Sequence, residues 1–154
     1  GSTENDRYVV YNYSENTWYI GNLDRTAGAD RGAFRQPMLA DASDMYIYEH
    51  EVGFDYSGLT PFAETGPFRI GTGENVVSVT GLIPDEKNLG DVNATFKARF
   101  FPTGTERSYG PFSLTNPTAV RFTGRQLRLR VEGQKLTDWR VGINRVNAVA
   151  GGQR

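Results

Sequence analysis

The sequence predicts an all-β protein whose larger part is an antiparallel β-sandwich or jelly-roll-like domain, preceded by a short β-hairpin region. Two observations carry this prediction. Gly, Pro, Asn or β-branched residues interrupt every segment that could form an amphipathic helix of ordinary length. Short segments rich in β-branched and aromatic residues, separated by turn residues, recur along the whole chain instead. A chain of 154 residues suits one domain, or one domain with a smaller attached part.

The first part of the chain predicts a hairpin and one further strand. Residues 8–13 and 17–21 are β-rich and flank a polar turn at residues 14–16, and residues 45–50 form the next β-rich segment. A hairpin with one extra strand cannot bury its own faces. Residues 1–57 are therefore predicted to be a hairpin region that packs on other structure.

The second part, residues 58–154, predicts the sandwich itself. In its clearest segment Phe96 and Ala98 alternate with Thr95, Lys97 and Arg99, as expected for a strand with one buried face. Pro67 marks an edge or a bulge in the first segment. The predicted strands cover residues 62–70, 75–82, 92–101, 119–122, 126–132 and 139–149.

The composition excludes several chemistries. The chain has no cysteine, which removes disulfides, thiolate metal sites and cysteine nucleophiles. No apolar run approaches the ~18 residues of a membrane-spanning helix, so no membrane contact is expected. No phosphate-binding glycine loop occurs, and no cofactor is expected. No Gly-x-Ser-x-Gly motif surrounds a serine, which argues against a serine-histidine-acid triad.

Acidic residues and the single histidine do not predict a catalytic or metal site. His50 lies between Glu49 and Glu51, and on a strand it points away from both. Asp41 and Asp44 are better explained as caps of the turn within residues 39–44 than as a catalytic pair. The loops 39–44 and 83–91 contain oxygen ligands without the spacing of a calcium-binding loop. We therefore expect no catalytic residues, no metal site and no enzymatic activity.

Charge is distributed unevenly along the chain. Residues 1–60 carry ten acids and four arginines, whereas residues 121–154 carry eight basic residues and two acids. Arg128 and Arg130 share one face of a predicted strand, and Arg121 and Arg125 lie just upstream. These four arginines are candidates for internal neutralisation or for an assembly face that meets acidic surface on a neighbouring copy. The net charge of −1 and the lack of interleaved aromatics disfavour DNA contact.

Aromatic residues gather around the predicted hairpin. Tyr11, Tyr13, Trp18 and Tyr19 form either buried packing or an exposed platform on which sugars stack. Trp139 alternates with Val141 and Ile143, which predicts a core position for this tryptophan.

Several segments together resemble one group of proteins. The stretches "YNYSENTWYIG", "MYIYEHEVG", "ETGPFRIGTGENVVSVTGLIPD" and "FTGRQLRLRVEG", with "DWRVG" after them, follow one another in this order. They resemble the C-terminal region of virion structural proteins of tailed phages and prophages, from about Tyr8 to Arg154. In that group a propeller-like body is followed by a terminal β-sandwich.

The resemblance implies a role without a chemistry. It implies a non-enzymatic virion structural protein, part of a tail or a head-to-tail connector, whose partners are other virion proteins or copies of itself. Residues 1–57 would be the remnant of an upstream propeller-like body. The expected location is the virion, assembled in the cytoplasm of the host bacterium. The alternative function is a carbohydrate-binding or host-recognition module that binds surface glycans.

Overall fold

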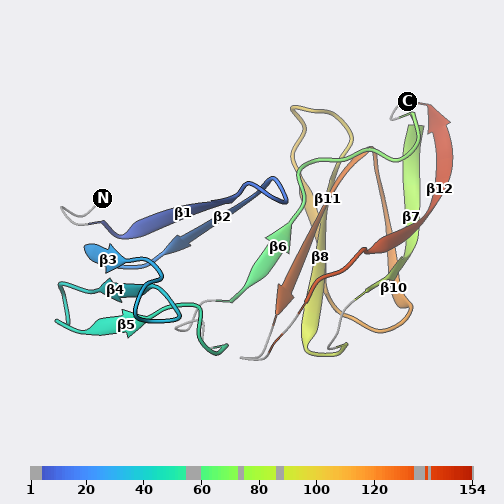
Figure 1. The fold of residues 1–154 in the computed structure, drawn as a ribbon. Helices are drawn as coiled ribbons and strands as arrows, with labels where there is room; N and C mark the ends of the chain where they lie inside the picture. Colours follow the sequence, from blue (N-terminus) through green and yellow to red (C-terminus); the bar gives the residue numbers. More distant parts are fainter. Residues whose placement is uncertain are drawn as a thin grey trace. The chain divides into compact units, whose positions relative to one another are not determined.

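The computed structural model describes residues 5–54, 60–72, 75–85, 89–133, 138 and 140–153, and these residues form strands and no helix. None of them is therefore part of a helix that could cross a membrane. The prediction of an all-β fold with a β-sandwich is confirmed (Figure 1). The chain divides into two compact units, Gly1–Gly53 (unit 1) and Phe54–Arg154 (unit 2). The predicted boundary after residue 57 and the predicted core position of Trp139 lie outside the described residues.

Unit 1 begins with a two-stranded hairpin. The strands β1 (Arg7–Asn12) and β2 (Thr17–Asn22) pair antiparallel, with Tyr11 opposite Trp18. The side-chain oxygen of Asn12 accepts hydrogen bonds from the backbone N–H groups of Ser14 and Glu15 at 3.1 and 3.2 Å, which organises the turn. Asn16 has a φ of 53°, a left-handed conformation that asparagine tolerates. The hairpin forms where the sequence predicts it.

Unit 1 also contains a three-stranded antiparallel sheet in the order β3-β4-β5. The strand β5 (Ile47–Glu49) lies within the predicted strand at residues 45–50. The strands β3 (Ala27–Ala29) and β4 (Met38–Ala40) are not predicted from the sequence. Three residues are too few to show an alternating pattern, so only the pairing with neighbours defines these strands.

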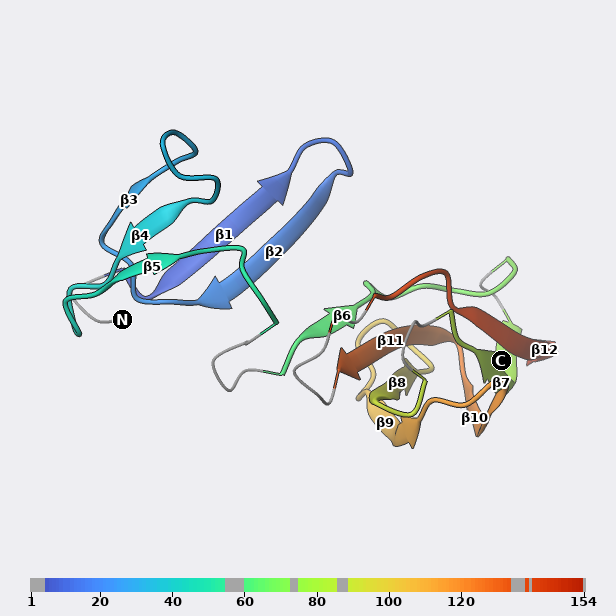
Figure 2. The same cartoon turned by 60° about the horizontal axis from the view of Figure 1, so that its bottom comes forward.

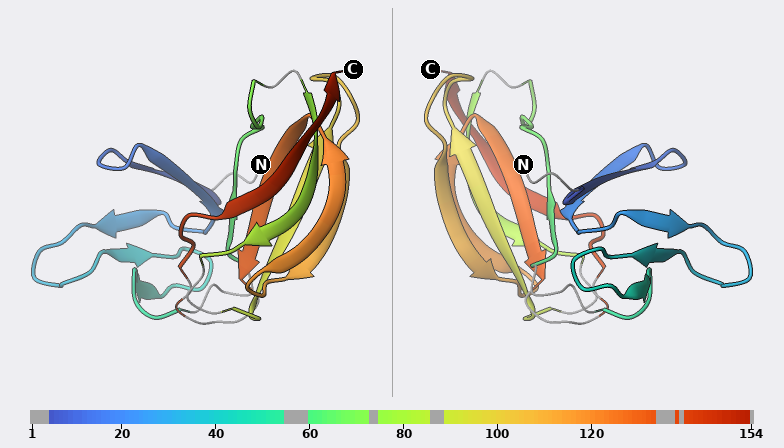
Figure 3. Two further views of the ribbon diagram at one scale, coloured as in Figure 1. Left: turned by 90° about the vertical axis from the view of Figure 1, so that its right-hand side faces the viewer. Right: turned by 90° about the vertical axis from the view of Figure 1, so that its left-hand side faces the viewer.

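Unit 2 is a sandwich of two antiparallel sheets. The first has the order β6-β11-β8-β9 and the second the order β10-β7-β12. Figure 3 shows β10, β7 and β12 as one layer against the other sheet. The strands are β6 (Phe62–Glu64), β7 (Asn75–Ile83), β8 (Val92–Arg99), β9 (Arg107–Ser113), β10 (Thr118–Gly124), β11 (Gln126–Gly133) and β12 (Arg145–Gln153).

The core of unit 2 lies between the two sheets. Along β8 and β10 every second residue is buried, so each strand sends one row of side chains inward. The ring of Phe122 lies 4.9 Å from that of Phe96 and 4.8 Å from that of Tyr109, measured between centroids. These contacts close the sandwich on the side of β9 and β10. The buried apolar residues are Val77, Val79, Leu82, Val92, Ala94, Phe96, Ala98, Leu114, Val120, Phe122, Leu127, Leu129 and Val131.

The other side of the sandwich lies between β6 and β12, and both are edge strands. Figure 2 shows β6 beside β11, and β12 beside β7. The predicted strand at residues 62–70 is shorter than expected, because regular pairing with β11 stops at Glu64 and resumes as a single bridge at Phe68. Pro67 lies in the interruption, as predicted for an edge or bulge. The strand β12 begins at Arg145, six residues later than the predicted start at residue 139.

Candidate functional site

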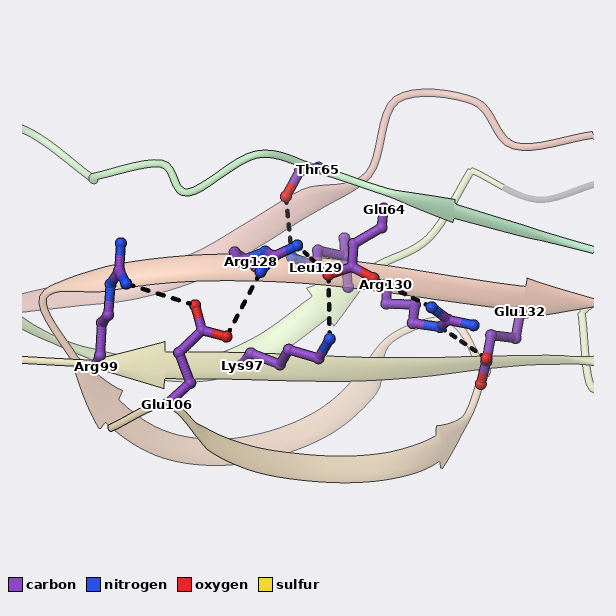
Figure 4. Close-up of polar contacts among 9 residues, drawn as sticks. All are labelled: Glu64, Thr65, Lys97, Arg99, Glu106, Arg128, Leu129, Arg130 and Glu132. Atoms are coloured by element: carbon purple, nitrogen blue, oxygen red, sulfur yellow. Dashed lines mark hydrogen bonds and ion pairs between the residues drawn. The ribbon is translucent and has the colours of Figure 1, made fainter. Parts of the chain in front are cut away.

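The predicted arginine ridge is only partly present. Arg128 lies opposite Lys97 in the pairing of β11 with β8, and Arg130 follows it on the same outer face (Figure 4). Arg121 lies on β10, which belongs to the other sheet, and Arg125 lies in the turn between β10 and β11. Because the chain changes sheets at this turn, the four arginines do not form one continuous ridge.

Glu64 of the edge strand β6 gathers three of the cations on the outer face. Its carboxylate oxygens lie 2.5 Å from Arg128 Nη2, 3.1 Å from Lys97 Nζ and 3.2 Å from Arg130 Nη1. The side chain of Glu64 is only 12% exposed. Burial alone would raise its pKa, but hydrogen bonds from Lys97 and Arg130 outweigh burial and lower the pKa of this carboxyl.

Two further acids complete this charged network. Glu132 Oε1 lies 2.7 Å from Arg130 Nε, and Glu106 Oε2 lies 3.5 Å from Arg128 Nη1. The guanidinium of Arg130 also lies over the ring of Phe62, 3.8 Å from its centroid. The acids that neutralise Arg128 and Arg130 therefore come from unit 2 itself. The acidic residues of unit 1 are not needed to balance these two arginines.

The predicted aromatic patch divides over the hairpin. Tyr11 and Trp18 share one face, where their rings stack with centroids 4.4 Å apart. The Tyr11 hydroxyl donates a hydrogen bond to Asn16 Oδ1 at 2.9 Å. Tyr19 points to the opposite face, because it follows Trp18 along the strand, and Tyr13 lies in the turn. Two of the four residues thus form a stacked pair, with Trp18 66% exposed.

Unit 1 has no buried residue among residues 5–53. Both faces of the hairpin display apolar side chains: Val9, Tyr11, Trp18 and Ile20 occupy one face, and Tyr8, Val10 and Tyr19 the other. Ile20 is 74% exposed. Large apolar side chains of this unit are exposed at Tyr8, Val9, Val10, Tyr11, Tyr13, Trp18, Tyr19, Ile20, Phe34, Met45, Tyr46, Ile47, Tyr48 and Val52.

A group of polar side chains connects the three-stranded sheet of unit 1 to the segment that follows β2. Arg25 Nη1 lies 2.9 Å from Asp41 Oδ2, and Arg25 Nε donates to His50 Nε2 at 3.0 Å. The guanidinium lies over the ring of Tyr48, 4.2 Å from its centroid. Burial, with the charge of Arg25, lowers the pKa of His50. Sequence patterns do not identify Arg25, because its partners lie 16 and 25 residues away.

The predicted capping roles of Asp41 and Asp44 are confirmed. Asp41 Oδ1 accepts hydrogen bonds from the backbone N–H and the hydroxyl of Ser43, at 2.8 and 2.5 Å. These bonds lower the pKa of Asp41. Asp44 Oδ1 accepts from the backbone N–H of Tyr46 at 2.9 Å, and its other oxygen accepts from the Tyr48 hydroxyl. Both aspartates therefore organise the turn before β5.

An apolar groove opens on the side of unit 2 between β6 and β12. It has a volume of about 510 Å³ and is lined mostly by apolar side chains from both sheets. Asp85 fixes Gly142, a residue of the groove lining, because the backbone oxygen of Asp85 accepts a hydrogen bond from Gly142 N–H at 2.8 Å. Sequence patterns do not reveal this groove, because strands distant in the sequence form it. The lining residues are Ala63, Glu64, Thr65, Phe68, Ile70, Leu129, Val131, Val141, Gly142, Asn144 and Val146.

Comparisons with known proteins add no assignment to these surfaces. No protein-family model matches the chain, and no curated protein matches its sequence. Within the described ranges, no group of three or more histidine, aspartate and glutamate side chains is arranged to hold a metal ion. The surfaces that can serve a function are the exposed apolar surface of unit 1, the charged face and the groove.

Proposed function

We propose that this protein is a non-enzymatic structural component that acts through protein–protein assembly contacts. The assembly we propose is the virion of a tailed phage or prophage, in which the chain is part of the tail or of the head-to-tail connector. Its partners are then copies of itself or other virion proteins.

The observation that carries the proposal is the exposed apolar surface of unit 1. None of residues 5–53 is buried, although this unit contains a large share of the aromatic residues of the chain. Soluble monomers rarely display large contiguous apolar surface, and such surface marks protein–protein contacts. A hairpin exposed on both faces is also marginal in water. An assembly partner that covers unit 1 accounts for both features.

The assignment to a virion is supported by the sequence resemblance alone. The segments that carry the resemblance lie in both units. The stretch "YEHEVG" overlaps the end of β5 and continues past it, and "GRQLRLRVE" covers most of β11. The sandwich of unit 2 agrees with the terminal sandwich of that group, although sandwiches serve many functions.

Sedimentation velocity of the full chain across a concentration series tests the assembly function. We expect reversible association that strengthens with protein concentration, because covering unit 1 removes apolar surface from water. A chain that sediments as a monomer at every concentration, with and without other virion proteins, would contradict the proposal. Virus particles purified from the encoding bacterium test the assignment to a virion. Mass spectrometry should detect the chain in these particles, and its absence would overturn the virion assignment alone.

Carbohydrate binding is the second candidate, because the Tyr11–Trp18 stack is exposed. Exposed rings of this kind give sugars a flat apolar surface. A titration with bacterial surface glycans, followed by tryptophan emission, tests this candidate. Saturable binding that Trp18→Ala abolishes and Tyr46→Ala preserves would support it. No change in emission across the panel, with the protein folded, would exclude it for those glycans.

A further inference from the structure

We propose that the apolar groove between β6 and β12 of unit 2 receives the β1–β2 hairpin of a second copy of this chain. This inference rests on the proposed assembly function and specifies its contact. The interface would be head-to-tail, because unit 1 of one copy would contact unit 2 of the next.

The groove offers an incomplete sandwich edge. Leu129 and Val131 of β11 form its floor from one sheet, and Val146 of β12 contributes from the other. These side chains pack against the core, so a ligand that fills the groove would extend the core of the sandwich. A volume of about 510 Å³ is large enough for several apolar side chains.

The groove also offers unused hydrogen-bonding groups. The side-chain oxygen of Asn144 is buried and has no hydrogen-bond partner among the described residues. The strand β12 pairs with β7 on one side only, and among the described strands none pairs with its other backbone edge. Arg145 is the single charged residue of β12, so charge does little to prevent another strand from pairing with this edge. An incoming strand could supply N–H groups both to Asn144 and to this edge.

The hairpin matches the groove in shape and chemistry. It is a short two-stranded ribbon whose more exposed face carries Val9, Trp18 and Ile20. Both of its strands are edge strands, so each has backbone groups that can pair with a further strand. The stacked rings of Tyr11 and Trp18 hold this apolar face in one arrangement before binding, which lowers the entropic cost of association.

Charge complementarity selects a second copy as the occupant. Residues 1–53 carry nine acids and four arginines, and residues 54–154 carry nine acids and thirteen lysines and arginines. Arg69 and Arg145 are exposed, and each is adjacent in sequence to groove-lining residues; Arg140 is also exposed and lies 3.5 Å from Asp138. Acids border the hairpin at Glu15 in the turn and at Asp6 before β1, where Asp6 Oδ1 lies 3.9 Å from Arg7 Nε. The opposite net charges of the two parts therefore favour a contact between unit 1 of one copy and unit 2 of another.

A head-to-tail contact has a defined consequence for assembly. Each copy would use its hairpin in one neighbour and its groove in another, so association would continue into a closed ring or an open filament. Rings and tubes are the forms that a virion tail or connector requires of its subunits.

The experiment uses four substitutions in the full chain. Ile20→Glu places a charge on the hairpin face, and Ile47→Glu makes the same change on β5 as its control. Val141→Glu places a charge in the groove, and Ile143→Glu is its control, because Ile143 is 77% exposed and does not line the groove. We expect each test variant to raise the dissociation constant by at least ~100-fold, because a carboxylate would be left unpaired in an apolar contact. The controls should associate as the wild type does.

Mixing the two test variants distinguishes a head-to-tail contact from a symmetric one. Each variant keeps one intact half of the interface. An equimolar mixture of Ile20→Glu and Val141→Glu should therefore form a complex of two chains, whereas each variant alone stays monomeric. In a symmetric contact of hairpin with hairpin, Val141→Glu alone would still associate and the mixture would form no complex of the two variants, and this result would overturn the proposal.

A second variant guards against misfolding of Val141→Glu, because Val141 packs partly against the core. The double variant Arg69→Glu/Arg145→Glu changes only exposed residues that are adjacent in sequence to the groove lining, and Arg107→Glu/Arg121→Glu is its charge-matched control. We expect about tenfold weaker association for the Arg69→Glu/Arg145→Glu variant at low salt and a smaller difference at high salt. If the wild type associates and both groove variants associate equally well, the groove contact is wrong while the assembly function stands. A wild type that is monomeric by itself would overturn the groove contact, and one that also stays monomeric with other virion proteins would overturn both.

Discussion

Glu64 determines the arrangement of the charged face of unit 2. It lies on a strand of three residues at the sheet edge, and its carboxylate joins Lys97, Arg128 and Arg130 across β8 and β11 (Figure 4). Without this carboxylate, three cations would face one another in a half-buried position. Glu64 therefore both fixes the edge strand and permits the density of positive charge on the neighbouring strands.

We predict that Glu64→Gln lowers the free energy of unfolding by about 1–3 kcal/mol, because removing one member of a shielded ionic network leaves its partners uncompensated. Glu106→Gln is the control, since Glu106 is more exposed and lies at 3.5 and 4.0 Å from Arg128 and Arg99. It should cost less than about 1 kcal/mol. Urea denaturation of both variants measures the difference, and equal losses would contradict the central role of Glu64.

The pH dependence of this residue has a defined sign. Because the pKa of Glu64 is lower in the folded chain than its ordinary value of 4.5, its stabilising effect is complete above that pH. The effect is lost as pH falls below 4.5 toward the folded-state pKa. The Glu64→Gln variant should therefore lose less stability than the wild type over this acidic range.

At the scale of elements, the three-stranded sheet of unit 1 depends on a polar cluster more than on a core. Arg25 connects the segment after the hairpin with the turn before β5 and with His50 after β5. His50 accepts a hydrogen bond from Arg25 through Nε2, which requires this nitrogen to be unprotonated. The sheet should therefore respond to protonation of the single histidine in the chain.

We predict that the sheet of unit 1 loses stability as pH falls through about 6.5, the ordinary pKa of histidine. The folded-state pKa of His50 is lowered, so the unfolded chain binds the proton more readily, and stability rises with pH across this window. A nuclear magnetic resonance titration of the imidazole, with amide exchange in β4 and β5, measures both effects. In His50→Gln, where the side-chain oxygen can accept the same bond, this pH dependence should disappear. Its persistence there would assign the effect to another group.

The long strands of the sandwich could be predicted from the sequence, whereas the short strands and the groove could not. Alternation along β8 and β11 identifies which side chains face inward, because one sheet face is buried. In β9 the Gly110–Pro111 pair removes that signal, and β3 is only three residues long. The alternation places Arg128 and Arg130 on one face, as the structure does, but their partner Glu64 is more than 60 residues away. Sequence patterns report local geometry and do not report which distant strands become neighbours.

At the scale of the whole molecule, the two units differ in what stabilises them. Unit 2 has a continuous core of buried apolar side chains between two sheets. In unit 1 none of residues 5–53 is buried, so its stabilising contacts are backbone pairing, the Tyr11–Trp18 stack, turn hydrogen bonds and the cluster around Arg25. Regions with few buried apolar contacts open locally at low free energy, whereas core strands open only with global unfolding. Assembly should therefore reduce local opening in unit 1 more than in unit 2.

We predict that hydrogen exchange divides the chain at the boundary between the units. In dilute protein at high salt, where association is weakest, amides of β1 and β2 should exchange at least ~10-fold faster than those of β7, β8 and β11. Raising the protein concentration should slow exchange in the hairpin, because a neighbouring copy covers it, and should leave the core strands unchanged. Mass spectrometry of the exchanged protein measures both, with Ile20→Glu as the variant whose hairpin stays fast at every concentration. If the hairpin is protected equally in dilute monomer and in assembled protein, its cover lies within its own chain, and the exposed apolar surface of unit 1 no longer argues for a second copy.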